Sequence, residues 1–135
     1  MNRREARETV FTLLYERNFQ EGESPALQYA EALELRDLPE DTYMNEVYLG
    51  VCDKIEELDE KIVENSSGWS IARMSKITRT ILRLSTYEML YREDIPYNIS
   101  INEAVELAKK YEDEKAPSFI NGILNAIATK EGLKH

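Results

Sequence analysis

This 135-residue chain has little of the chemistry that most enzymes use. It contains one cysteine, Cys52, and one histidine, His135, which is the last residue. A cysteine–histidine nucleophile pair and a metal site that includes histidine are therefore not expected. The sequence also has no glycine-rich phosphate loop and no dinucleotide-binding glycine pattern. We expect no metal and no cofactor.

Long apolar runs are absent as well. No run approaches the roughly 20 residues that a membrane span needs, and the charged start at 1–7 is not followed by the apolar segment of a signal peptide. A single cysteine excludes a disulfide within the chain and is typical of a reducing compartment. The sequence thus predicts a cytoplasmic protein without membrane contact, folded as one domain over residues 1–135.

Basic residues are outnumbered, since the net charge is −9. The acidic excess is local: residues 16–64 carry 15 acidic and 4 basic side chains, a net of −11, and the other 86 residues have a net of +2. The stretch 66–87 contains no acidic residue but four basic ones. This asymmetry permits a basic face on an acidic protein, which nucleic-acid binding would need.

Glycine and proline are scarce, at 5 and 4 residues, and they fall where helices should begin or end. No stretch alternates apolar and polar residues as a half-buried strand does. Apolar spacing of three to four residues instead predicts helices. The expected helices lie at about 3–19, from Pro25, from Pro39 through Ile62 as the longest, after Ser75, after Ser100 and from Pro117.

The expected N-caps are Ser24, Ser75 and Ser100. Glu103 lies three residues after Ser100, the spacing of a capping box. The break at Ser66-Ser67-Gly68 separates sub-bundles of about 1–65 and 66–135. The fold class is therefore all-α, with two small helical bundles packed into one domain.

A few residues are candidates for a functional role. Arg3, Arg4 and Arg7 begin the first helix and are the best electrostatic candidates for RNA contact, although three arginines at a helix start are common without any ligand. The aromatic side chains of Tyr15 and Phe119 lie beside core positions. They are core residues by default, but either could stack on an RNA base.

Arg83 lies between apolar residues, so it is either a surface cation or a partly buried one. A buried guanidinium needs an anionic partner, and Glu88 and Glu103 are the expected carboxylates. We predict the paired, structural role for these residues.

Several short motifs occur in a fixed order. They are Ala6-Arg7-Glu8, Leu13-Leu14-Tyr15, Ile81-Leu82-Arg83-Leu84 with Tyr87-Glu88, Asp94-Ile95-Pro96, Ile101-Asn102-Glu103-Ala104 and Phe119-Ile120-Asn121-Gly122-Ile123-Leu124. Together they resemble the NusB family of transcription antitermination factors, over nearly the whole chain.

The resemblance implies a non-catalytic protein that binds boxA-type RNA of ribosomal RNA transcripts together with the ribosomal protein NusE. The pair would join other Nus factors on RNA polymerase. The RNA-binding residues implied are Arg3, Arg4, Arg7, Tyr15 and Phe119. A partner surface is implied on the second bundle.

That partner surface is expected at Arg73, Thr78 and Lys115. Some family members carry acidic residues at the positions of Ala72, Arg73 and Thr78, so individual partner contacts need not transfer.

Two alternatives remain open from the sequence. The chain could be an accessory module related to the N-terminal domain of ribosomal RNA methyltransferases, although no methyl-donor-binding βα region follows in this sequence. It could also be a purely protein-binding helical scaffold, which the net charge of −11 over residues 16–64 favours.

Overall fold

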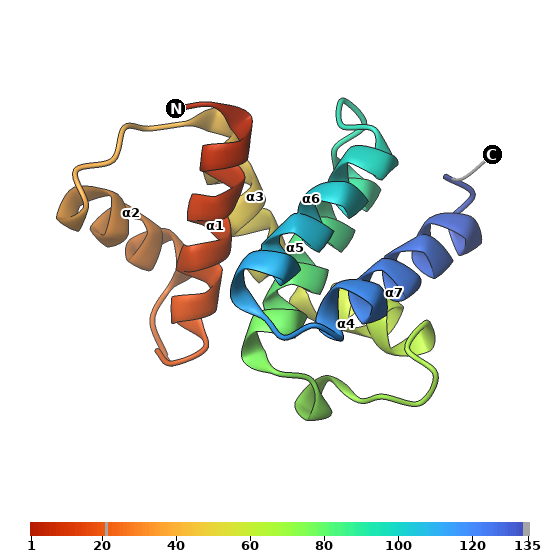
Figure 1. Cartoon of the computed structure of the whole chain (residues 1–135). Helices are drawn as coiled ribbons and strands as arrows, with labels where there is room; N and C mark the ends of the chain where they lie inside the picture. Colours follow the sequence, from red (N-terminus) through yellow and green to blue (C-terminus); the bar gives the residue numbers. More distant parts are fainter. Residues whose placement is uncertain (21, 134–135) are drawn as a thin grey trace.

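The computed structural model describes residues 1–20 and 22–133, in which the chain is helical and contains no β-strand (Figure 1). The helices are α1 (Arg3–Arg17), α2 (Pro25–Leu35), α3 (Thr42–Asp53), α4 (Ile55–Glu64), α5 (Lys76–Tyr91), α6 (Tyr97–Tyr111) and α7 (Ala116–Lys130), with one 3-10 turn, η1 (Ile71–Arg73). The all-α prediction is confirmed. His135 lies outside the described residues.

Two of the three predicted N-caps, Ser24 and Ser75, are present in the structure. The Ser24 hydroxyl accepts a hydrogen bond from the amide of Leu27, and the Ser75 hydroxyl accepts one from the amide of Thr78. Each serine thereby satisfies an amide that the first turn leaves without an intrahelical partner. These two predicted caps are confirmed.

The predicted capping box at Ser100 and Glu103 is wrong. Helix α6 begins at Tyr97, directly after Pro96, and the amide of Ser100 donates to the carbonyl of Pro96. Proline restricts the residue before it but is compatible with a helix that starts after it. Ser100 is therefore inside the helix, with its side chain buried.

The long helix predicted from Pro39 is two helices. Helix α3 begins at Thr42, where the Asp41 carboxylate accepts from the amide of Met44 at 3.0 Å. The helix is interrupted at Lys54, and α4 follows in a new direction. The apolar stripe continues on both sides of the break. Both helices pack against α5, while α3 also packs against α1 and α2 and α4 also packs against α7.

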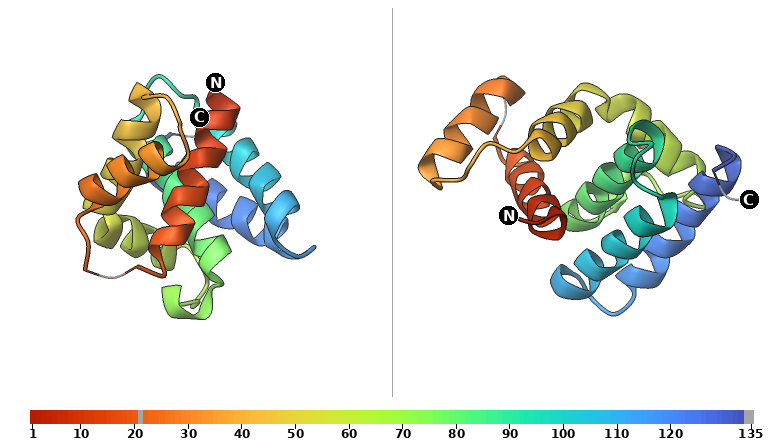
Figure 2. Two further views of the ribbon diagram at one scale, coloured as in Figure 1. Left: turned by 90° about the vertical axis from the view of Figure 1, so that its left-hand side faces the viewer. Right: turned by 90° about the horizontal axis from the view of Figure 1, so that it is seen from above.

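Helix α5 is the centre of the molecule and packs against α1, α3, α4, α6 and α7 (Figure 2). Ten of its residues are buried, among them the apolar Ile81, Leu82 and Leu84 and the carboxylate of Glu88. Because α4 packs with the later helices, we propose that the second helical group begins near Ile55 rather than near residue 66, within one domain. None of the helices in the described part of the chain has the length and apolar character that a membrane crossing requires.

Candidate nucleic-acid interface

A buried ionic cluster joins α1 to α5 and α6. Arg7 donates to Glu88 through Nε at 2.7 Å and Nη2 at 3.2 Å, and through Nη1 to Glu103 at 3.2 Å. Tyr43 and Ser100 also donate their hydroxyl groups to Glu88. All the anionic partners that this arginine needs are thus supplied from inside the protein.

The burial of Arg7 determines its role. The side chain is 5% exposed, and Glu88 is fully buried. Burial alone would lower the pKa of Arg7, but the hydrogen bond and the charge of Glu88 outweigh it, and the pKa is raised. Arg7 borders the surface hollow between α1 and α6, but its guanidinium is held by Glu88 and Glu103, which leaves little of it for the RNA contact predicted from the sequence. Its role is to hold α1 on the second helical group.

Arg83 is paired with a carboxylate, as predicted, but with a different one. Its Nε and Nη2 donate to the two carboxylate oxygens of Asp59 at 2.7 and 2.8 Å. Glu88 and Glu103, the partners expected from the sequence, bind Arg7 instead. Arg7 is 81 residues from Glu88 and 96 residues from Glu103, so the spacing of nearby residues could not predict these pairs.

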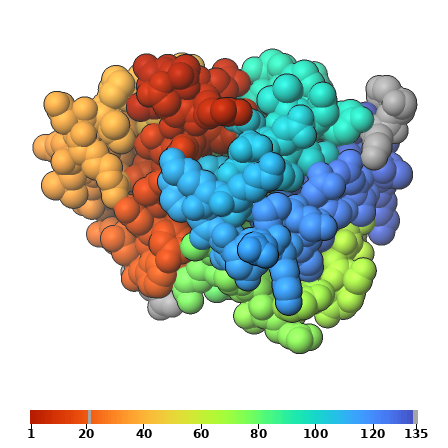
Figure 3. Space-filling model, in the orientation of Figure 1, coloured from red at the N-terminus to blue at the C-terminus, as the bar shows by residue number. Residues whose placement is uncertain are grey.

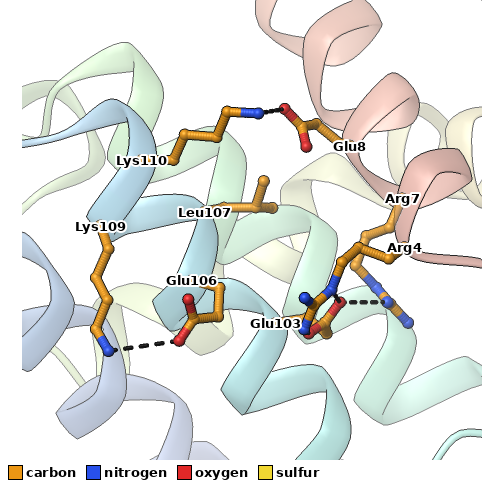
Figure 4. A pocket seen from close by; sticks show the side chains of 8 residues that line it. All are labelled: Arg4, Arg7, Glu8, Glu103, Glu106, Leu107, Lys109 and Lys110. Carbon is orange, nitrogen blue, oxygen red and sulfur yellow. Dashed lines mark hydrogen bonds and ion pairs between the residues drawn. The ribbon is translucent and has the colours of Figure 1, made fainter.

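The exposed seam between α1 and α6 forms a hollow of about 380 Å³ (Figure 4). Arg4 spans it and donates to the Glu103 carboxylate at 3.0 and 2.6 Å. Across the seam, Lys110 donates to Glu8 at 2.5 Å, and Tyr111 donates its hydroxyl to the same carboxylate. The seam therefore presents cations and an aromatic ring at the surface, each held in place by a carboxylate.

Arg3 points to a different side of α1. Its guanidinium lies over the Tyr43 ring of α3, 4.5 Å from the centroid, whereas Arg4 points to α6. The two exposed arginines therefore do not form a single basic cluster.

Aromatic side chains follow α1 from the seam toward its end. Tyr111 contacts Phe11 with 5.1 Å between centroids, Phe11 stacks with Tyr15 at 6.4 Å, and Tyr15 meets Phe19 edge to face at 5.4 Å. Phe19 is 62% exposed, and Tyr15 is half-buried. Lys76 of α5 lies over the Phe19 ring. This row combines stacking surfaces with nearby cations, which is the combination that single-stranded RNA needs.

Phe119 lies in a second hollow, of about 370 Å³, at the start of α7. It packs edge to face on Trp69 at 5.5 Å, and Arg73 lies over the Trp69 ring at 4.8 Å. The predicted partner residues Arg73, Thr78 and Lys115 line the same hollow. The structure therefore groups Phe119 with the predicted partner surface.

The starts of α1 and α7 are separated by α6, whose C-terminal part lies between them on this face (Figure 3). Lys109, Lys110 and Tyr111 lie at this end of α6, and they are not among the candidates predicted from the sequence. A basic pair followed by an aromatic residue at a helix end was the available signal.

Metal ligands are not grouped on this face or elsewhere in residues 1–20 and 22–133: no three His, Cys, Asp or Glu side chains are placed to share an ion. The side chains at the seam and in the hollow at the start of α7 include arginine, lysine and aromatic residues. Side chains of these types can contact anionic and planar ligands.

The sequence model of the NusB family matches residues 4–129. The chain belongs to the NusB family. It is 45% identical to the transcription antitermination protein NusB of Acetivibrio thermocellus over 129 residues, which covers 94% of this chain and 88% of that protein.

Solved NusB-family structures have the same fold. The T. maritima NusB structure matches with a TM-score of 0.88 at 32% identity, covering 96% of this chain and 92% of that one. A chain from a crystal structure of the antitermination factors NusB and NusE in complex with double-stranded RNA matches with a TM-score of 0.83 at 31% identity, covering 95% and 96%.

Proposed function

We propose that this NusB-family chain is a non-catalytic transcription antitermination factor that binds RNA together with the ribosomal protein NusE. The observation that carries the proposal is the face on which α1, α6 and the start of α7 place exposed cations beside aromatic rings. Relatives named as antitermination proteins, and a similar chain crystallised with NusE and RNA, support it.

On this face, Arg4, Lys109 and Lys110 would contact phosphates, and Tyr111 and Tyr15 would offer rings to bases. Lys109 and Lys110 have side chains that are 60% exposed, so a phosphate can reach them. Each is paired with a carboxylate, Glu106 or Glu8, that a phosphate must replace. The gain per phosphate is therefore small, and RNA binding by the chain alone is expected to be weak.

The hollow at the start of α7 is the proposed NusE surface. Trp69, Arg73, Thr78 and Lys115 would face NusE, while the free edge of Phe119 would face the RNA. Phe119 would then lie where the two proposed surfaces meet, which would let NusE and RNA strengthen each other's binding. The natural RNA would be the boxA segment of ribosomal RNA transcripts in the cytoplasm, with other Nus factors and RNA polymerase completing the assembly.

Fluorescence anisotropy with a boxA oligonucleotide and a scrambled oligonucleotide of equal composition tests this proposal. We expect weak binding of both RNAs by the chain alone, and tighter, boxA-selective binding when NusE is added. If NusE binds but neither RNA does, the chain is a protein-binding scaffold and the proposal is wrong. Tight binding of any sequence without NusE would also contradict it.

A further inference from the structure

A groove of about 530 Å³ lies between α2, α3 and the segment that joins them. Its apolar lining comes from Ala26, Tyr29, Ala30, Leu33, Leu38 and Leu49. Helix α2 lies at the edge of the molecule, where it packs against α3 and leaves its other side open (Figure 2). The groove is thus formed by elements other than those of the proposed RNA and NusE surfaces.

Helix α2 also exposes two large apolar side chains, but neither of them lines the groove. Leu35 is 86% exposed and Leu27 is 52% exposed. Single exposed leucines are ordinary, so the apolar surface that matters here is the lining of the groove itself. This surface would gain free energy by being covered.

The groove carries negative charge without compensating cations. Glu34, Asp37 and Glu40 line it, and in the described part of the chain no lysine or arginine forms an ion pair with any of them. The nearest arginine in the sequence, Arg36, is held by Glu16 instead. Three uncompensated carboxylates along one groove repel one another and create a negative potential that favours a cationic ligand.

Tyr29 lies at the base of the groove, and the pKa of its hydroxyl is raised. Burial raises the pKa of its hydroxyl, and the negative charges of Glu40 and Asp41 raise it further. The hydroxyl donates a hydrogen bond to Glu40 at 3.4 Å. Because the hydroxyl is neutral, the net charge of that carboxylate is not cancelled.

We propose that the α2–α3 groove docks a basic amphipathic helical segment of a protein partner. Its apolar side chains would enter the groove, and its lysines or arginines would face Glu34, Asp37 and Glu40. Binding of an amphipathic helix in a groove is a common recognition mode, and charge complementarity selects the basic partner. RNA is disfavoured by like charge, and so is a second copy of this acidic chain.

The test uses a synthetic helical peptide with leucines at i, i+3, i+4 and i+7 spacing and lysines elsewhere, and a scrambled peptide of equal composition. Binding to the isotope-labelled full chain is followed by amide chemical shifts in NMR. We expect saturable binding of the first peptide, with shifts concentrated on α2, the connecting segment and α3. The scrambled peptide should bind more weakly, because charge alone does not fill the groove.

Two variants of equal charge separate the groove from general electrostatic attraction. The groove variant is Glu34→Gln/Asp37→Asn/Glu40→Gln, and the control is Glu56→Gln/Glu60→Gln/Glu64→Gln on the exposed side of α4. Because each carboxylate pair at a surface contributes modestly, we expect the groove variant to weaken binding roughly tenfold. The control should weaken it much less.

A third variant, Ala30→Glu, distinguishes the two explanations by the sign of its effect. It adds negative charge but places a polar side chain in the apolar lining, so docking in the groove predicts weaker binding and nonspecific attraction predicts tighter binding. The proposal is overturned if Ala30→Glu binds more tightly, if both triple variants lose affinity equally, or if the scrambled peptide binds as well. Concentration-dependent shifts at the groove without peptide would show that a second copy of the chain occupies it. None of these outcomes depends on RNA binding, so the result is independent of the proposed function.

Discussion

The guanidinium of Arg7 and the carboxylate of Glu88 form a buried, two-bonded ion pair although they are 81 residues apart in the sequence. The pair ties the first helix to the central one. Because both groups are removed from water, each charge would destabilise the fold if the other were absent.

Arg7→Met should destabilise the fold strongly, because it leaves the Glu88 carboxylate buried without its cation. Removing one partner of a buried pair costs about 3–5 kcal/mol. Urea unfolding measures this cost, with Arg4→Met as a control, since Arg4 bonds a carboxylate at the surface. Equal unfolding midpoints for the two variants would show that Arg7 is not a structural residue.

Gly50 and Gly122 should respond to alanine in opposite ways. A Cβ on Gly50 would overlap the phenol of Tyr87, whereas one on Gly122 in α7 meets nothing within 4 Å. Overpacking costs about 1–3 kcal/mol, and glycine to alanine at an open helical site gains up to about 1 kcal/mol. Thermal unfolding should therefore show Gly50→Ala below the parent and Gly122→Ala above it. A tolerated Gly50→Ala would mean that Tyr87 does not pack against α3 in this way.

Acid should destabilise the protein through the α1–α6 seam. The hydrogen bond from Arg4 lowers the pKa of Glu103 below its ordinary 4.5, and hydrogen bonds from Lys110 and Tyr111 lower that of Glu8. A carboxylate whose pKa is lower in the folded state stabilises the fold above its unfolded pKa, and this stabilisation is lost as the pH falls through the folded value.

We therefore expect little change in unfolding free energy from neutral pH down to about 5 and a decline below about 4.5. Glu103→Gln should reduce the stability at neutral pH and flatten the decline. The control Glu5→Gln removes an exposed carboxylate of α1 and should change the stability much less. A Glu103→Gln curve parallel to that of the parent would rule out this carboxylate as a source of the acid sensitivity.

Phe119→Ala should weaken boxA binding roughly five- to a hundredfold, because losing a base stack costs about 1–3 kcal/mol. The measurement is RNA affinity with NusE present, corrected for the folded fraction. The correction matters because Phe119 also packs on Trp69. If the variant is destabilised but its folded fraction binds boxA normally, Phe119 is a packing residue.

Local patterns in the sequence were sufficient to predict the helical class and two of the three caps. They failed where the outcome depends on tertiary contacts. The break at Lys54 has no proline or glycine beside it, and the same apolar stripe continues through two helices that share α5 as a neighbour but differ in their other neighbours. The start of α6 was misplaced because Ser100 resembles a cap, although its hydroxyl serves buried Glu88.

In the candidate site, too, local sequence patterns were sufficient for some residues, and tertiary contacts decided others. Arg4 and Tyr15 were predicted from the sequence, and in the structure Arg4 is exposed and Tyr15 is half-buried. Arg7 was chosen for its place in an arginine run, but its burial depends on a carboxylate far away in the chain. Tyr111 was missed because nothing local shows that the end of α6 lies beside α1.

The most direct test of the central claim, that RNA crosses the seam between α1 and α6, is the salt dependence of boxA affinity in Lys109→Gln/Lys110→Gln. Each phosphate contact on a single strand contributes about 0.7 to the slope of log affinity against log salt, so losing two should make the slope shallower by about 1.4. The control Lys54→Gln/Lys130→Gln removes the same charge elsewhere. With NusE present, we expect a weaker affinity and a shallower slope for the first variant only. Identical slopes and affinities for the two variants would contradict it.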